Sequence, residues 1–222
     1  YSSAASDVYK RQFGYGGNAL FNGLSASFAK EQISCIVGPN GCGKSTLAKL
    51  AMGLIKPASG RVLIQGRDVA SLNPRERARR LGVLVQQQEA PMMTVRELAA
   101  CGRFPHHGPL SRLDETDAQC IDETLSLAGV YDLRDRPLRS LSGGQRQRAR
   151  MAMVLAQDTP VVLLDEPTSF MDAAACFDMM RLVRRVRERG KTVIAVIHDL
   201  NLALSVADAV FVMERGRLAC LL

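Results

Sequence analysis

The chain has 222 residues, 47% hydrophobic and 23% charged, an ordinary balance for one globular domain or one domain with an insert. Its net charge of +7 suits phosphate ligands, an anionic membrane surface or nucleic acid, but solvated helix faces explain it equally well. The arginines are scattered and no basic run alternates with aromatic residues, which argues against a nucleic-acid platform. No apolar run approaches the ~20 residues that a membrane-spanning helix needs, and no secretory signal is visible.

Six cysteines, at positions 35, 42, 101, 120, 176 and 220, include no C-x-x-C pair, and with only three histidines a zinc site is not expected. We interpret them as reduced, mostly buried thiols of a cytoplasmic protein. Residues 1–12 begin without Met and show no clear alternation, so we interpret them as a leader foreign to the natural protein and leave them out of the expected fold. Residues 218–222 stop inside a strand pattern, which indicates a truncated C-terminus.

Strand and helix patterns alternate along the chain. Strands are expected at 20–28, 33–37, 60–65, 81–85, 161–164 and 192–197, and helices at 47–52, from 73, from 94, at 114–128, at 142–157 and before Gly190. Residues 103–112 contain two prolines and a glycine and predict a loop. Continuous apolar strands that alternate with helices predict an α/β fold, with a parallel sheet covered on both faces. Ligands of such sheets bind beyond the carboxyl ends of the strands.

One glycine-rich stretch stands between a predicted strand and a predicted helix: Gly38-Pro39-Asn40-Gly41-Cys42-Gly43-Lys44-Ser45-Thr46. It fits the phosphate-loop pattern G-x-x-x-x-G-K-[ST]. The glycines let several backbone N–H groups point at one phosphate, and the helix dipole adds to that field. We predict that Lys44 reaches the β- and γ-phosphates of ATP and that the Ser45 hydroxyl ligates Mg²⁺. The alternative is a glycine-rich turn that arose by chance.

Polar side chains also follow three other predicted strands. Asp165 is expected to hold Mg²⁺ through water, and Glu166 to orient and polarise an attacking water. The alternative is that both acids are helix-capping charges. Gln86 is expected to ligate the metal or a water without adding charge, although two further glutamines follow it. His198 is expected to hydrogen-bond the γ-phosphate, the alternative being a structural histidine.

A second helix start has the features of an anion site: Leu141-Ser142-Gly143-Gly144-Gln145. It offers a hydroxyl, two glycines and free N–H groups. One ATP does not need two such cradles from one subunit, so we expect each to face the nucleotide of the other subunit in a two-fold dimer. A plain helix cap is the alternative interpretation.

These motifs together resemble the ATP-binding subunit of an ABC transporter. Gly38–Thr46 is similar to Walker A, Leu141–Gln145 to the signature motif and Val161–Glu166 to Walker B, and the order and spacing match across about residues 13–220. The resemblance implies that Tyr15 stacks on adenine, that Gln86 is the Q-loop residue, that 169–172 is the D-loop with Asp172, and that His198 is the switch histidine. It also implies a head-to-tail dimer that sandwiches two ATP, with Ser142, Gly143 and Gly144 acting in trans.

The resemblance further implies a P-loop nucleotide-hydrolase (RecA-like) core, an N-terminal antiparallel β subdomain and an inserted α-helical subdomain. Residues 13–222 would form a single ABC ATPase domain, with 13–92 and 158–222 as catalytic core and about 93–157 as helical subdomain. The implied partners are a second copy of the chain, transmembrane permease subunits and, indirectly, a substrate-binding protein, but no nucleic acid. The implied location is peripheral, on the cytoplasmic face of the inner membrane.

A narrower resemblance points to importer ATPases for iron–siderophores, haem and cobalamin. It rests on Thr94–Leu98, Gly102–His106, Ala156–Pro160 and His198–Asn201. Two residues depart from the family pattern, Met171 where Leu is usual and Val85 where Pro is common before the glutamine. The implied function is a bacterial type II importer ATPase, with ferric siderophores as first choice of cargo. The alternatives are haem, cobalamin or another cargo, an exporter ATPase, and a soluble ABC ATPase acting on nucleic acid.

The segment that leads from Gln86 into the helical part is expected to contact the permease. An aromatic side chain and an arginine side by side in a loop are typical anchors of a protein interface. We therefore expect Arg103 and Phe104, with His106 and His107, to be exposed and to receive a short cytoplasmic helix of the permease. The alternative is that Phe104 packs under its own loop.

Overall fold

The structure, a computed structural model, describes residues 6–15, 18–85, 90–107, 112–169 and 171–221; of residues 6–15 and 18–23 it gives the backbone alone. Its centre is a six-stranded sheet in the order β10-β9-β3-β8-β7-β6. Five strands run parallel to one another: β3 (Ile33–Val37), β6 (Leu81–Leu84), β7 (Val161–Asp165), β8 (Thr192–Val196) and β9 (Ala209–Glu214). The sixth, β10 (Arg217–Cys220), is antiparallel to β9. The predicted α/β class with a mostly parallel sheet is confirmed.

A second, antiparallel sheet is formed mainly by the N-terminal part of the chain, as predicted. It has the order β2-β1-β4-β5 and comprises β1 (Ser6–Tyr15), β2 (Asn18–Phe28), β4 (Ser59–Ile64) and β5 (Arg67–Asp68). Leaving residues 1–12 out of the fold is therefore wrong for residues 6–12, which supply most of β1. The pairing of β1 with β2 shifts register between Val8 and Arg11 and again before Gly14. Such irregularities break the alternation of period two by which a strand is recognised.

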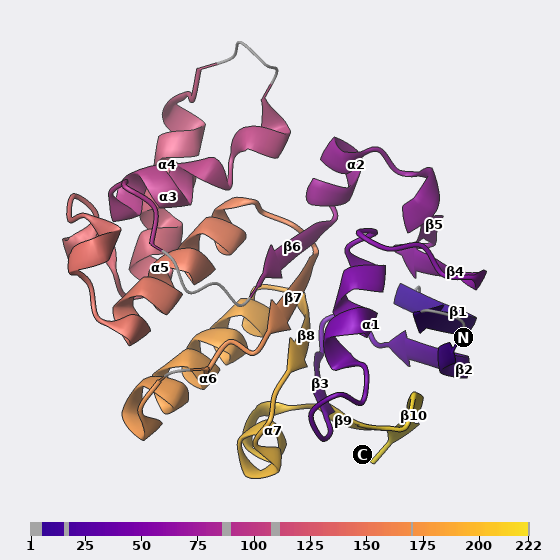
Figure 1. Cartoon of the computed structure of the whole chain (residues 1–222). Helices are drawn as coiled ribbons and strands as arrows, with labels where there is room; N and C mark the ends of the chain where they lie inside the picture. Colours follow the sequence, from indigo (N-terminus) through magenta and orange to yellow (C-terminus); the bar gives the residue numbers. More distant parts are fainter. Residues whose placement is uncertain (1–5, 16–17, 86–89, 108–111, 170, 222) are drawn as a thin grey trace.

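The helices flank the central sheet (Figure 1). They are α1 (Lys44–Ala51), α2 (Pro74–Ala78), α3 (Val95–Cys101), α4 (Glu115–Leu127), α5 (Gly143–Ala156), α6 (Ala173–Glu188) and α7 (Leu200–Val206), with short 3₁₀ turns at Val69–Ser71, Phe104–His106, Tyr131–Leu133 and Leu138–Ser140. The predicted caps are confirmed, because Asn73, Thr94 and Ser142 each form a capping box. In Figure 1, α3, α4 and α5 form a group on one side of the central sheet, and the antiparallel sheet lies on the other.

The central sheet buries apolar side chains on both faces. Val162 and Leu164 of β7 pack in one cluster with side chains of α3, α5 and α6. Val161 and Leu163 belong to the opposite cluster, with α1 and the antiparallel sheet. Full burial of such a side chain contributes about 1.5–3 kcal/mol, so the two clusters hold the strand ends in fixed relative positions.

The six cysteines all lie among the described residues and form no disulfide bond. Cys35 and Cys42 are buried, Cys101, Cys120 and Cys176 are partly exposed, and Cys220 is exposed. The expectation of mostly buried thiols is therefore wrong for four of the six. These four lie on α3, α4, α6 and the terminal strand β10, whereas the two buried thiols lie on β3 and in the phosphate loop.

Two elements near the C-terminus were absent from the sequence analysis, α7 and β9. Asp199 caps α7, accepting hydrogen bonds from the N–H groups of Asn201 (2.8 Å) and Leu202 (3.1 Å). Asp208 accepts a hydrogen bond from the Ile33 N–H (2.7 Å) and so joins the start of β9 to the start of β3. Both elements are short; α7 begins at its local cap, whereas the start of β9 is tied to a distant strand.

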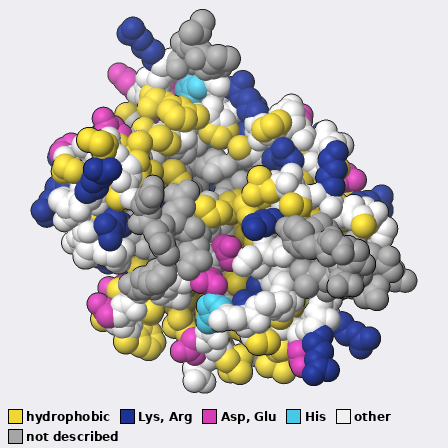
Figure 2. Space-filling model, viewed as in Figure 1, with side chains coloured by type: hydrophobic (Ala, Val, Ile, Leu, Met, Phe, Trp, Pro, Cys, Tyr) yellow, Lys and Arg dark blue, Asp and Glu magenta, His cyan; other side chains and the backbone are white. Residues whose placement is uncertain are grey.

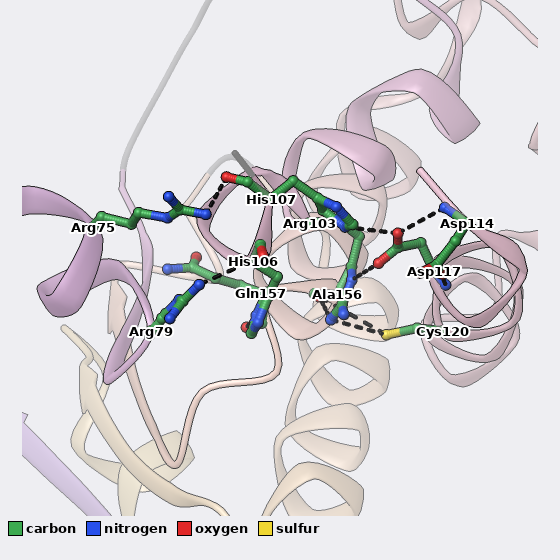
Figure 3. A network of polar contacts seen from close by, with 10 residues as sticks. All are labelled: Arg75, Arg79, Arg103, His106, His107, Asp114, Asp117, Cys120, Ala156 and Gln157. Carbon is green, nitrogen blue, oxygen red and sulfur yellow. Dashed lines mark hydrogen bonds and ion pairs between the residues drawn. The ribbon is translucent and has the colours of Figure 1, made fainter. Parts of the chain in front are cut away.

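Helix α2 is joined to the 3₁₀ turn Phe104–His106 by two arginines (Figure 3). The Nε atoms of Arg75 and Arg79 both donate to the Pro105 carbonyl, at 2.9 and 2.8 Å. A second nitrogen of Arg75 donates to the His107 carbonyl. The loop predicted at 103–112 is thus partly a 3₁₀ turn, and hydrogen bonds from Arg75 and Arg79 hold its backbone.

Arg103 departs from the prediction for this segment. Its side chain is only 12% exposed, and its Nε donates to Asp117 Oδ1 (2.8 Å) while Nη1 donates to the Ala156 carbonyl (2.9 Å). His107 Nε2 lies 2.7 Å from the other oxygen of Asp117. Burial raises the pKa of Asp117, but hydrogen bonds from the Asp114 backbone, Arg103 and His107 more than offset this and hold it well below its usual value. Arg103 therefore ties α4 to α5, and the expectation of an exposed anchor is wrong.

Candidate functional site

The phosphate loop leaves β3 through a tight approach to a neighbouring strand. A Cβ atom at Gly38 would lie 2.2 Å from the Met213 carbonyl oxygen of β9, so no larger residue fits there. Gly43 has φ 111° and forms the N-cap of α1. Glycine adopts such a conformation without steric cost. The strand, loop and helix that the motif requires are therefore all present.

Lys44 is buried within its own loop. Its Nζ donates to the carbonyls of Gly38 (2.7 Å) and Pro39 (2.9 Å) and lies 3.9 Å from Cys42 Sγ. Only 5% of the residue is exposed. The carbonyls are neutral acceptors, and a phosphate oxygen would be a stronger, charge-assisted one. The ammonium group is thus already desolvated at the place where an anion would bind.

Asp165 ends β7 with an unsatisfied acceptor. Its Oδ1 is buried and has no hydrogen-bond partner. Burial, and then the neighbouring charge of Glu166, raise the pKa of Asp165, although His198 and Lys44 act in the opposite direction. A buried carboxylate oxygen without a partner is costly unless a cation or donor reaches it. Together with the exposed hydroxyl-bearing Ser45, it offers the oxygen ligands that Mg²⁺ prefers, so the residues present fit this ion.

Glu166 lies directly beside His198, as the shared edge of the sheet predicts. His198 Nε2 contacts Glu166 Oε1, and Ser169 Oγ donates to Glu166 Oε2 (2.9 Å). Burial raises the pKa of Glu166, but the hydrogen bonds from Ser169 and His198 and the charges of His198 and Lys44 lower it further than burial raises it. The carboxylate is therefore charged and oriented from two sides.

The backbone at Glu166 is unusual. Its φ is 52°, in the left-handed region that residues with a Cβ rarely adopt. The conformation is maintained because the Glu166 N–H donates to the Val196 carbonyl (3.1 Å) and its own carbonyl accepts from the Ser169 N–H (3.2 Å). Strained residues of this kind gather at functional sites, where the surrounding structure holds them.

A hollow of about 510 Å³ lies beside this pair. Its lining includes Glu166, His198 and Ser169, and also Cys176 and Phe177 of α6. In Figure 2, acidic side chains and a histidine lie next to one another on the lower part of the face, while Lys and Arg side chains are spread around the described surface. The pair is thus reachable from solvent.

The signature residues form a helix cap within their own chain. Ser142 Oγ accepts from the Gln145 N–H (3.3 Å) and the Ser142 N–H donates to Gln145 Oε1 (3.0 Å). In the described part of the chain, the hydrogen bonds of Leu141–Gln145 include none with Gly38–Thr46. Both interpretations of this motif therefore stand, because a helix cap and a cradle for a partner's nucleotide use the same exposed helix start.

The remaining predicted site residues are accounted for as follows. Asp172 is the N-cap of α6, accepting from the Ala175 N–H (2.8 Å). Tyr15 ends β1, and the structure describes its backbone alone. Gln86 lies outside the described residues. The contact of Ser169 with Glu166 was not predicted, although a hydroxyl three residues after this acidic residue is visible in the sequence.

Comparison with known proteins identifies the family. Residues 21–169, more than half of the chain, match the family described as ABC transporter. The chain belongs to this family. Within it, the achromobactin transport ATP-binding protein CbrD of Dickeya dadantii is 43% identical over 88% of this chain and 73% of that protein. The iron(3+)-hydroxamate import ATP-binding protein FhuC of Bacillus subtilis is 38% identical over 91% of this chain and 76% of that protein. The ferric enterobactin transport ATP-binding protein FepC of Escherichia coli is 39% identical over 92% of this chain and 76% of that protein.

Solved ABC cassettes share the fold. A nucleotide-free ATP-binding cassette from an ABC transporter superposes with a TM-score of 0.87 at 25% identity, covering 96% of this chain and 89% of that one. A bacterial ABC transporter cassette solved as a dimer has a TM-score of 0.80 at 26% identity, with 94% and 93% covered. The ABC chain is thus a nucleotide-binding subunit. Among the residues that its structure describes, no helix is both long and apolar enough to cross a membrane.

The buried position of Lys44 leads to a binding prediction. Lys44→Ala removes a charge-assisted contact to phosphate, which contributes about 1.5–3 kcal/mol, so affinity for ATP should fall about tenfold to a hundredfold. Isothermal titration calorimetry measures this directly. Lys49→Ala, an exposed lysine further along α1, is the matched control and should bind like the parent. Equal affinity of the Lys44 and Lys49 variants would show that the loop is not the phosphate cradle.

Proposed function

We propose that this ABC chain hydrolyses ATP to power import of ferric siderophores. The observation that carries the catalytic part is the Glu166 carboxylate, charged and held between His198 and Ser169 at the edge where the phosphate loop begins. The cargo rests on the curated relatives, whose names are those of achromobactin, iron(3+)-hydroxamate and ferric enterobactin transport proteins. Haem, cobalamin or another chelate is the alternative cargo.

In the proposed mechanism Lys44 exchanges its carbonyl partners for the β- and γ-phosphates. Ser45, Gln86 and, through water, Asp165 would hold Mg²⁺, which would neutralise phosphate charge. Glu166 accepts a proton from water as the water oxygen forms a bond to the γ-phosphorus. The bond from that phosphorus to the bridging oxygen breaks, giving ADP and phosphate.

Two further residues complete the nucleotide site in this proposal. Tyr15 stacks on the adenine, as the family resemblance implies. His198 holds Glu166 in the nucleotide-free chain and hydrogen-bonds the γ-phosphate when ATP is present. The same imidazole thus connects the base with the group that is lost on hydrolysis. Residues 13–92 and 158–222 act as the catalytic core, and about 93–157 as the helical subdomain.

The signature motif is proposed to act across a dimer. Ser142, Gly143 and Gly144 have exposed or half-exposed positions at the start of α5, and Leu141 and Gln145 fix that start by packing and capping. A related cassette is solved as a dimer. In the proposed dimer the free N–H groups of this helix start face the γ-phosphate bound by the partner, and the D-loop with Asp172 lies between the two sites.

The partner in the membrane is proposed to be a permease, which places this chain on the cytoplasmic face of the inner membrane. A substrate-binding protein would deliver the cargo from the other side. Phe104 is 63% exposed on the turn held by α2, so of the anchors expected from the sequence it is the one that remains available to a partner. We propose that it packs against a cytoplasmic helix of the permease.

Replacing the proposed base tests the function. Glu166→Gln keeps shape but cannot accept the proton, so ATP hydrolysis should fall about 10²–10⁴-fold, while ATP affinity stays at the level of the parent. In vesicles with the permease, the parent should accumulate a ferric siderophore in preference to haem and cobalamin, and Glu166→Gln should accumulate none. Glu188→Gln, an exposed acid at the end of α6, is the control. Rapid hydrolysis by Glu166→Gln would refute the catalytic assignment, and preferred uptake of haem or cobalamin would refute the cargo.

The dimer can be tested by complementation. Ser142→Arg should block hydrolysis because the long charged side chain obstructs the partner's site, while each chain still binds ATP. Mixed with Lys44→Ala, it should regain activity, since one composite site of the heterodimer is intact. Ser126→Arg on α4, also exposed, serves as control and should be active alone. No recovery in heterodimers demonstrated by cross-linking would count against action in trans.

The permease contact can be tested at Phe104. Phe104→Ala should leave the ATPase activity of the isolated chain within about twofold of the parent, because surface substitutions change stability by about 0.5 kcal/mol or less. It should weaken co-purification with the permease and lower siderophore uptake about tenfold, as loss of an interface anchor does. Leu54→Ala, also an exposed apolar residue, should do neither. Unimpaired assembly and uptake with Phe104→Ala would place the permease elsewhere.

A further inference from the structure

The hydroxyl of Ser169 is the second contact of the Glu166 carboxylate. Ser169 Oγ donates to Oε2 (2.9 Å), while His198 contacts Oε1. The proposed function uses Glu166 as base and His198 as its neighbour, and Ser169 enters it only as the first residue of the predicted D-loop, with no role for its hydroxyl. Because the two contacts involve different oxygens, together they fix the plane of the carboxylate, which either contact alone would leave free to rotate.

The geometry of the turn shows that this contact is not the usual one for a serine. Ser71, Ser140 and Ser205 each donate their hydroxyl to the backbone carbonyl three residues earlier, at 2.7, 2.8 and 2.7 Å. Ser169 also stands three residues after its partner, and its N–H donates to the Glu166 carbonyl (3.2 Å) as the Ser140 N–H does to the Pro137 carbonyl. Its hydroxyl, however, donates to the Glu166 side chain (2.9 Å) and not to that carbonyl.

The segment that carries Ser169 is anchored to a different element from the one that carries His198. Cys176 Sγ of α6 contacts the Thr168 carbonyl (3.7 Å), the Met171 N–H donates to the same carbonyl (3.3 Å), and Asp172 caps α6. Ser169 is therefore held to the start of α6, whereas His198 follows β8. The Glu166 side chain joins the two.

The need for such a support follows from the backbone of Glu166. With φ 52° the residue turns away from the strand direction, so β7 by itself does not aim the side chain. The charges of Asp165 and Lys44 attract or repel the carboxylate without fixing its rotation, and His198 contacts only Oε1. A neutral hydroxyl fixes the orientation and leaves the charge available to take a proton.

We propose that Ser169 is a positioning residue for ATP hydrolysis, holding the Glu166 carboxylate through Oε2 in the orientation from which it accepts the proton of the attacking water. The inference rests on the proposed function, because it requires Glu166 to be the base. It adds that the segment between β7 and α6 takes part in orienting the base.

Three variants test the hydroxyl in the full chain. Ser169→Ala should lower kcat about tenfold, since misplacement of a catalytic group by about 1 Å costs up to 10²-fold, and should leave KM and the calorimetric affinity for ATP within about twofold. Ser169→Thr keeps the hydroxyl and should recover most of kcat. Ser205→Ala, a serine lining the same hollow whose hydroxyl bonds a backbone carbonyl, is the control and should match the parent. A kcat of Ser169→Ala equal to that of Ser205→Ala, or no recovery with Thr, overturns the proposal.

A double variant separates this inference from the proposed function. If Ser169 acts through Glu166, adding Ser169→Ala to Glu166→Gln should change the residual turnover by less than about twofold, because residues that act as a unit are not additive. A further tenfold loss in that background means that Ser169 acts elsewhere. If Glu166→Gln hydrolyses ATP like the parent, the proposed function fails and this inference with it. If Glu166→Gln is slow and Ser169→Ala is fast, only the present inference fails.

Discussion

The parallel pairing of β3, β8, β7 and β6 is the constraint on which the site depends. Parallel neighbours end at the same edge, so the groups that follow them meet although up to 160 residues separate them in sequence. Burial of apolar side chains on both faces makes this arrangement rigid. Gly38 lies so close to the Met213 carbonyl of β9 that a side chain at position 38 would not fit. The course of the phosphate loop after β3 therefore depends on β9 as well.

Most charges of the site are satisfied within the chain. Lys44 bonds carbonyls of its own loop, and Glu166 bonds His198 and Ser169. In the proposed function, binding of ATP is therefore largely an exchange of partners, and exchanges of hydrogen bonds yield small net free energies. Asp165 differs, because its buried Oδ1 has no hydrogen-bond partner to exchange.

Local motifs were predictable from the sequence, and contacts between distant elements were not. The phosphate loop, the buried strands and the caps at Asn73, Thr94 and Ser142 depend on neighbouring residues, and all are present. Strand β1 escaped recognition because its register shifts disturb the alternation, and β9 because a distant contact places it.

Arg103 shows most clearly that contacts between distant elements could not be predicted from the sequence. Its position in a loop with an aromatic neighbour predicts an exposed anchor, but a carboxylate on α4 and a carbonyl at the end of α5 bury it. Nothing in the sequence around Arg103 indicates that Asp117 and the Ala156 carbonyl are its partners. The pairing of Ser169 with Glu166 is the opposite case. The two residues are only three positions apart, but the spacing alone does not tell whether the hydroxyl donates to the Glu166 carbonyl or to its side chain.

The way in which α2 holds the turn at Phe104–His106 has a consequence for engineering. Arg75 and Arg79 bond carbonyl groups, which every amino acid possesses, so this anchorage does not depend on which side chains the turn carries. Phe104 takes no part in these bonds and projects outward. If Phe104 contacts the permease as proposed, residue 104 can be replaced to suit a different membrane protein while the two arginines still hold the backbone of the turn in place.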